Sequence, residues 1–149
     1  MVEIIFKPTL HQFRTCWEFA EEFQLTAQDL VLTNEYIYQP YFGQMNLGCH
    51  VLFQEKYGSG EPTDVMADAI LADVARTGCK RVVAIGGGTV IDIAKVLAVS
   101  DGEGMDALYD RAPNLEKKRE LVILPTTCGT GSEVTNISIM ARTRLGTKL

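Results

Sequence analysis

The chain has few of the residues from which metal centres and disulfide scaffolds are built. Of its 149 residues, only two are histidine and four are cysteine. The cysteines are scattered with no Cys-x-x-Cys pair, and a chain of this length does not need disulfide bonds to hold its fold. We therefore expect reduced thiols, and two histidines are too few for a histidine-rich metal centre made from these residues alone.

Basic side chains and long apolar runs are also scarce. Fourteen lysines and arginines face nineteen aspartates and glutamates, which gives a formal net charge of −5. This balance argues against broad attraction to nucleic acid or to an anionic membrane, but it does not exclude a small local anion-binding site. No run approaches the roughly 20 apolar residues that span a bilayer, and no basic stretch followed by an apolar core begins the chain. We expect a cytoplasmic protein with neither nucleic acid nor membrane as a partner.

The composition otherwise suits a single folded domain over residues 1–149. Hydrophobic residues make up 46% and charged residues 22%, far from the composition of disordered chains. Short apolar runs alternate with amphipathic helical stretches, a pattern typical of an α/β sheet with helices on its faces. The predicted strands are residues 3–7, 30–33, 49–54, 81–85, 121–124 and 136–141. One predicted helix follows Pro8. The other three cover residues 36–47, 64–77 and 89–99.

Apolar spacing also predicts which side chains these helices bury. In the first helix the residues that recur every three or four positions are Phe13, Cys16, Trp17, Ala20 and Phe23. We expect Trp17 to pack in the core. Another predicted helix is capped by Thr63 and ends before Gly78. The side chains that it is predicted to bury are Met66, Ala69, Ile70 and Val74. Residues 81–85 form a continuous apolar run, typical of a central parallel strand buried on both faces.

Small polar residues follow three of the predicted strands. They are Asn34 with Glu35, residues 86–89 (Gly-Gly-Gly-Thr) and residues 126–131 (Thr-Thr-Cys-Gly-Thr-Gly). Ligands of parallel α/β sheets bind outside the carboxyl ends of the strands, where glycines allow close approach and helix N-termini attract phosphate. The hydroxyls of the last segment can donate to phosphate or hold a ribose. The sequence therefore predicts a nucleotide site suited to a diphosphate.

The two commonest nucleotide-binding motifs are absent. The dinucleotide pattern Gly-x-Gly-x-x-Gly that begins at Gly86 would need glycine at position 91, where Ile91 stands, and no Gly-Lys-Ser/Thr ending occurs. Each glycine turn taken alone is equally consistent with an ordinary tight turn. A nucleotide-binding module with no catalysis of its own therefore stays open as an alternative.

Two segments resemble those of a known family, the iron-containing (group III) alcohol dehydrogenases of the dehydroquinate-synthase-like fold. Residues 86–95, GGGTVIDIAK, resemble the family segment GGGSxxDxAK. Residues 125–135, PTTCGTGSEVT, resemble PTTxGTGSEVT. Details in residues 33–38 and 53–58 are most similar to the 4-hydroxybutyrate dehydrogenase branch. The resemblance implies the family's N-terminal cofactor domain, a Rossmann-like parallel sheet with flanking helices.

The resemblance also implies an activity and its cofactors. Members transfer a hydride between NAD and a primary alcohol or aldehyde, here 4-hydroxybutyrate and succinate semialdehyde, and some form homodimers. Their metal, Fe²⁺ or Zn²⁺, is held by an aspartate and three histidines of a helical C-terminal domain, which we expect to lie outside residues 1–149. These residues would then supply no catalytic residue and no metal ligand, and bind NADH weakly without turnover. Alternatives are a 1,3-propanediol, lactaldehyde or glycerol dehydrogenase, or a dehydroquinate-synthase-type lyase.

The resemblance assigns cofactor-binding roles to individual residues. Those expected to hold the NAD pyrophosphate are Gly87, Gly88 and Thr89. Those expected around the phosphates and the nicotinamide ribose are Thr126, Thr127, Thr130, Thr135 and Lys148. Helix position gives Asp92 a different role, since a carboxylate in the first turn either compensates the helix dipole or makes a local hydrogen bond.

Asn34 is expected at the adenosine ribose, where many members carry aspartate. Asparagine can accept from the ribose hydroxyls but lacks the negative charge that repels a 2′-phosphate, so the exclusion of NADP is left open. Two interpretations of the neighbouring Glu35 remain. It either supplies that charge or faces solvent.

Overall fold

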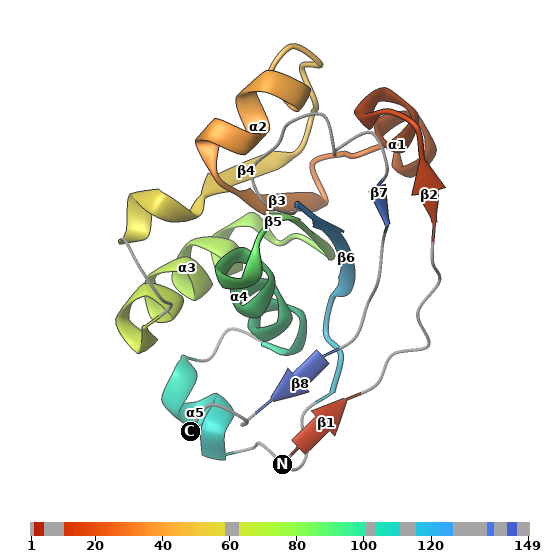
Figure 1. Ribbon diagram of the computed structural model, residues 1–149. Helices are drawn as coiled ribbons and strands as arrows, with labels where there is room; N and C mark the ends of the chain where they lie inside the picture. The colour runs from red at the N-terminus through yellow and green to blue at the C-terminus, as the bar shows by residue number, and fades with distance from the viewer. Residues whose placement is uncertain are drawn as a thin grey trace.

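A four-stranded parallel sheet forms the centre of the molecule (Figure 1). The structure, a computed structural model, describes residues 2–4, 11–58, 63–100, 104–110, 116–126, 137–138 and 143–145. The strand order is β4-β3-β5-β6. The strands are β3 (Asp29–Thr33), β4 (His50–Phe53), β5 (Arg81–Gly86) and β6 (Glu120–Pro125). The parallel sheet with flanking helices that the sequence predicts is confirmed.

Helices alternate with these strands along the chain. They are α1 (Cys16–Phe23), α2 (Glu35–Phe42), the 3₁₀ helix η1 (Gln54–Tyr57), α3 (Asp64–Thr77), α4 (Gly88–Val99) and α5 (Met105–Asp110). Among the residues that the structure describes, no helix is long and apolar enough to cross a membrane.

Two short antiparallel pairs lie beside the main sheet (Figure 1). β1 (Val2–Ile4) pairs with β8 (Thr143–Leu145), and β2 (Gln12–Phe13) pairs with β7 (Ile137–Ser138). The first predicted strand, residues 3–7, was expected in the parallel sheet, but β1 pairs with β8 instead. Strand β8 was not predicted. Strands of two or three residues are too short to show a periodicity, and their partners lie more than a hundred positions away.

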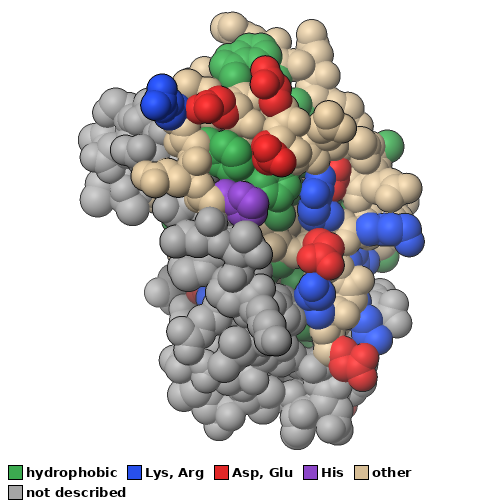
Figure 2. Space-filling view, turned by 90° about the vertical axis from the view of Figure 1, so that its right-hand side faces the viewer, with side chains coloured by type: hydrophobic (Ala, Val, Ile, Leu, Met, Phe, Trp, Pro, Cys, Tyr) green, Lys and Arg blue, Asp and Glu red, His purple; other side chains and the backbone are tan. Residues whose placement is uncertain are grey.

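Acidic side chains gather near the top of the face shown in Figure 2, and basic and acidic side chains alternate farther down. Several acidic and basic side chains of the described residues pair, as Lys117 does with Glu120 at 3.0 Å. Exposed pairs of this kind contribute about 0–1 kcal/mol each.

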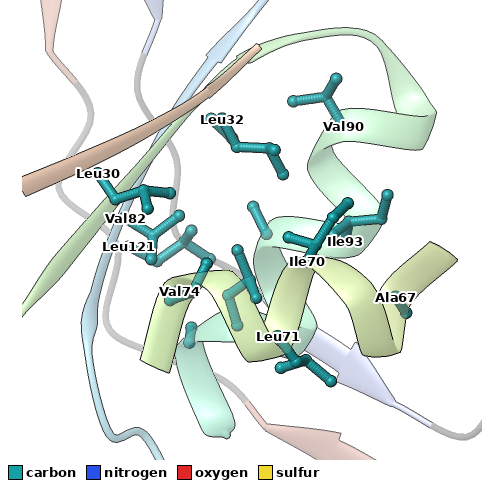
Figure 3. Packing of buried hydrophobic residues seen from close by; sticks show 14 of the residues in the cluster. Leu30, Leu32, Ala67, Ile70, Leu71, Val74, Val82, Val90, Ile93 and Leu121 are labelled. Atoms are coloured by element: carbon teal, nitrogen blue, oxygen red, sulfur yellow. The ribbon is translucent and has the colours of Figure 1, made fainter. Parts of the chain in front are cut away.

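Alternate side chains of the sheet enter two separate hydrophobic clusters. Leu30, Leu32 and Val82 point toward α3 and α4, where they meet Ile70 (Figure 3). Val31 points the other way, into a cluster with side chains of α1 and α2. Because both faces are covered, all five residues of β3 are buried. This is why the central strands are apolar throughout instead of alternating with polar residues.

Helix α3 begins and ends as the sequence predicts, but its buried face is broader. The Thr63 side chain accepts a hydrogen bond from the Met66 backbone N–H at 3.1 Å, and Gly78 ends the helix with φ of 67°. Ala69, a predicted core residue, is exposed instead, whereas Ala67 and Leu71 are buried. The reason is that α3 contacts α5 as well as α4 and the sheet, so a further side of it is covered.

The prediction for the first helix was wrong in its start and in the placement of Trp17. Thr15 accepts from the Glu18 backbone N–H at 3.1 Å, which sets the start of α1 at Cys16 and leaves Phe13 in β2. Phe19 is fully buried on the side facing the sheet, and Trp17 is 56% exposed. A start several residues later than expected changes which side chains share the inner face.

Candidate functional site

The chain changes direction across the sheet between β3 and β5. From β3 it runs through α2 to β4 on one side, and from β5 it runs through α4 and α5 to β6 on the other. Side chains of α2 and α4 belong to different core clusters, so the two helices cover opposite faces. Open α/β sheets bind ligands outside the carboxyl ends of the strands at such a point. The carboxyl edge of β3 and β5 is therefore the candidate site.

The last residues of β3 and β5 are tied together at this edge. Thr33 pairs in register with Ile85, and its hydroxyl donates to the Ile85 carbonyl at 2.6 Å. The backbone N–H of Thr126 donates to the Gly86 carbonyl at 3.0 Å, which extends the pairing of β5 with β6. The residues that follow these three strands therefore begin side by side.

The three consecutive glycines after β5 differ in what surrounds them. A Cβ at Gly86 would lie 3.1 Å from Val90 Cβ, closer than Cβ atoms ordinarily pack, so packing inside the protein favours glycine there. A Cβ at Gly87 or Gly88 would meet no described atom within 4 Å, and both residues are exposed. Contacts within the described structure therefore do not account for glycine at these two positions, whereas close approach of a ligand to the backbone does.

Helix α4 presents its N-terminus at the same edge. Gly87 is the N-cap, no side chain caps it within the described part of the chain, and the first intrahelical bond runs from the Ile91 N–H to the Gly87 carbonyl at 3.0 Å. The N–H groups of Gly88, Thr89 and Val90 therefore have no partner within the helix. Together with the helix dipole, they form a position suited to a phosphate.

The structure thus brings five of the predicted cofactor-binding residues to one edge of the sheet. They are Asn34, Gly87, Gly88, Thr89 and Thr126. The other four predictions, Thr127, Thr130, Thr135 and Lys148, lie outside the described residues.

A carboxylate that the sequence analysis did not single out lies beside Asn34. The Asn34 side-chain Nδ2 donates to Glu55 Oε1 at 3.0 Å and to Gln54 Oε1 at 3.1 Å, while the Glu35 backbone N–H donates to Glu55 Oε2 at 2.9 Å. Burial acts to raise the pKa of Glu55, but these hydrogen bonds and the charge of Lys56 outweigh it and hold the pKa below its ordinary value. Glu55 directly follows the predicted strand of residues 49–54, and this position could have marked it as a candidate site residue.

Glu35 itself is neither buried nor directed at Asn34. Its carboxylate lies 3.5 Å from the Lys56 ammonium, and both side chains are about half exposed, at 46% and 64%. An exposed pair of this kind contributes little to stability. Of the two interpretations of Glu35, neither is tested by the described contacts, but its charge has a partner of opposite sign.

Of the two roles expected for Asp92, compensation of the helix dipole was wrong. Helix α4 starts at Gly88, so Asp92 lies in the second turn, and no acidic residue occupies the first. Its carboxylate lies 4.0 Å from the ammonium of Lys95. The helix dipole effect falls off within the first turn, so the start of α4 keeps its positive potential for a ligand.

Metal-binding side chains do not gather in the described structure. Within residues 11–58, 63–100, 104–110 and 116–126 and the described short strands, no group of three or more His, Cys, Asp or Glu side chains could hold a metal ion. His11, expected near the start of a helix, precedes β2 and packs its ring against Phe13 and Phe23, at centroid distances of 6.0 and 5.5 Å. His50 is exposed at the amino end of β4, away from the candidate edge.

Comparisons with known proteins point to one family. Residues 8–149 match the family described as iron-containing alcohol dehydrogenase. The chain is 44% identical over 141 residues to 4-hydroxybutyrate dehydrogenase of Clostridium kluyveri, which covers 95% of this chain and 38% of that protein. It is 37% identical over 83 residues to the probable alcohol dehydrogenase EutG of Escherichia coli, covering 54% of this chain and 21% of that protein.

A solved structure agrees with this assignment of the fold. Sulfoacetaldehyde reductase from Bifidobacterium kashiwanohense, in complex with NAD⁺, superposes with a TM-score of 0.57 at 25% identity, over 78% of this chain and 32% of that chain. The chain described here thus spans well under half the length of these relatives.

Proposed function

This chain belongs to the iron-containing alcohol dehydrogenase family, as its two glycine-rich segments predict, and on that premise we propose that it binds NAD at the carboxyl edge of β3 and β5. It would form the cofactor-binding part of an oxidoreductase acting on a primary alcohol or aldehyde. One relative, 44% identical over 95% of this chain, is a 4-hydroxybutyrate dehydrogenase. We therefore propose 4-hydroxybutyrate and succinate semialdehyde as the substrate pair.

The observation that carries the proposal is the difference between Gly86 and the two glycines after it. Packing against Val90 accounts for Gly86, whereas no described atom lies within 4 Å of a Cβ at Gly87 or Gly88, beside N–H groups of α4 that have no partner within the helix. Backbone N–H groups at a helix start, with no Cβ in the way, are what a pyrophosphate needs. The NAD-bound reductase of similar fold supports NAD as the ligand.

Four described residues of the site would take part in binding NAD. The backbone of Gly87 and Gly88 would hold the pyrophosphate, and the Thr89 and Thr126 hydroxyls would donate to its oxygens or to a ribose. NAD, when bound, carries the hydride that passes to or from the substrate carbon. The described side chains do not fit a bound Fe²⁺ or Zn²⁺, so no step of the reaction is assigned to a metal here. Residence in the cytoplasm and assembly as a homodimer remain proposals.

The first prediction separates the role of Gly88 in binding from any role in folding. We expect Gly88→Ala to weaken NADH binding by about tenfold, or about 1.4 kcal/mol, because the added methyl group occupies the space that the pyrophosphate approaches. Its melting temperature should not fall, because a Cβ at Gly88 meets no described atom and alanine favours helix. NADH fluorescence titrations and thermal unfolding of the purified protein measure both quantities.

Gly48→Ala is the matched control. Gly48 also has open space around its Cβ position, but it precedes β4, at the amino edge of the sheet. The control should leave the NADH dissociation constant unchanged. The proposal is contradicted if the unaltered protein does not bind NADH, or if the two substitutions weaken binding equally.

A further inference from the structure

Glu55 is the carboxylate nearest to the residue expected at the adenosine ribose. It lies in η1, directly after β4, and reaches across to the end of the adjacent strand β3. Each of its oxygens accepts one hydrogen bond there, Oε1 from the Asn34 side chain and Oε2 from the Glu35 backbone N–H. A carboxylate has about four acceptor positions, so both oxygens can still accept from a ligand.

The Asn34 amide is held in the orientation that presents Glu55. Gln54 is buried, at 6% exposure, and its Oε1 accepts the second hydrogen bond from Asn34 Nδ2. The Gln54 side-chain nitrogen donates in turn to the Gly58 carbonyl at 3.4 Å. This network fixes position 34 as a donor toward Glu55. Aspartate at position 34 would instead place two carboxylates in contact.

The charges around Glu55 leave this corner of the site negative. Among the described residues, the ionisable groups in contact here are the carboxylates of Glu35 and Glu55 and the ammonium of Lys56. Lys56 pairs with Glu35 at 3.5 Å. One negative charge therefore remains, and the lowered pKa of Glu55 keeps it ionised at neutral pH.

We propose that Glu55, positioned by Asn34, is the residue that selects NAD over NADP. In dinucleotide-binding sheets, an acidic side chain accepts hydrogen bonds from the adenosine ribose hydroxyls and disfavours a 2′-phosphate. Here the acid comes from the end of the next strand, and Asn34 holds it in place at the end of β3. The proposal rests on the NAD site proposed above and deepens it, because it names the residue that discriminates between the two coenzymes.

The test compares Glu55→Gln with Glu35→Gln in the purified protein. Both remove one negative charge, from neighbouring side chains, and Glu35→Gln retains the backbone N–H that binds Glu55. Dissociation constants for NADH and NADPH are measured by fluorescence titration at low ionic strength, where charge effects are least screened. Glu55→Gln should improve NADPH binding relative to NADH by about tenfold, whereas Glu35→Gln should change that ratio by less than about twofold.

A double substitution keeps the test decisive if loss of Glu55 disturbs the local structure. In Asn34→Asp with Glu55→Gln, one carboxylate and one amide exchange places, and the preference for NADH should return to near that of the unaltered protein. If NADH binds but the Glu55→Gln and Glu35→Gln proteins prefer it over NADPH equally, the proposed role of Glu55 is wrong and the proposed NAD site is unaffected. If the unaltered protein binds neither coenzyme, the proposed function itself fails.

Discussion

At the scale of single residues, the site depends on pairs that are distant in sequence. Asn34 could be recognised from the sequence as an unusual residue for its position, but its partner Glu55 could not be assigned, because their contact forms only when β3 and β4 lie side by side. The glycines show the same limit. The sequence marks three in a row, and only the surrounding atoms distinguish Gly86, which packing favours, from Gly87 and Gly88.

A prediction at this scale concerns the identity of residue 34. Asn34→Asp removes the amide donor and sets a second carboxylate against Glu55, so we expect it to lower the free energy of unfolding by about 1 kcal/mol at neutral pH. The loss should shrink in acid as the two carboxyl groups take up protons. Urea unfolding at several pH values measures both effects.

Asn46→Asp supplies the comparison, because Asn46 is an exposed asparagine in a left-handed conformation that aspartate also tolerates. It should change stability little. Adding Glu55→Gln to Asn34→Asp should restore most of the lost stability. Equal stability of the Asn34→Asp and Asn46→Asp proteins would contradict the contact between positions 34 and 55.

At the scale of helices and strands, prediction succeeded where burial dictates the sequence. Strand β5 is apolar because both faces of the sheet are covered, and α3 carries its own start and stop signals in Thr63 and Gly78. Prediction failed for α1, whose inner face depends on where the helix begins, and for β8, whose partner β1 lies at the other end of the chain. The sequence of one short segment does not show which distant segment it pairs with.

A prediction at this scale concerns the link between η1 and α3. The Tyr57 hydroxyl donates to Asp73 Oδ2 at 2.6 Å. Burial, then this hydrogen bond and the charge of Asp73, raise the pKa of Tyr57 to about 12 from an ordinary 10. The neutral form is therefore favoured in the folded state, so the stabilisation is present below pH 10 and is lost as pH rises toward 12.

Tyr57→Phe removes the hydroxyl and serves as the reference for this titration. The unaltered protein should be more stable than Tyr57→Phe near neutral pH, and its advantage should decline between pH 10 and pH 12. Denaturant unfolding of both proteins across that interval measures the difference. An advantage that stays constant through the interval would show that Tyr57 does not titrate as its contact with Asp73 requires.

At the scale of the whole molecule, topology determines where a ligand can bind. The order β4-β3-β5-β6 sends the connections after β3 and β5 to opposite faces, and the start of α4 lies at the same edge as Asn34 and Thr126. The sequence could predict a parallel sheet and place polar residues at strand ends. It could not give the strand order, and so could not show which of those ends are neighbours.

The most direct test of this account is amide hydrogen exchange of the purified protein with and without saturating NADH. The account predicts slower exchange in NADH at residues 34–35 and 86–91 and at Thr126, where the carboxyl ends of β3, β5 and β6 meet the start of α4. Exchange at the amino ends of the same strands, around residues 29, 81 and 120, should not change. No slowing at residues 86–91, or slowing confined to the amino edge, would contradict a nucleotide site at this edge of the sheet.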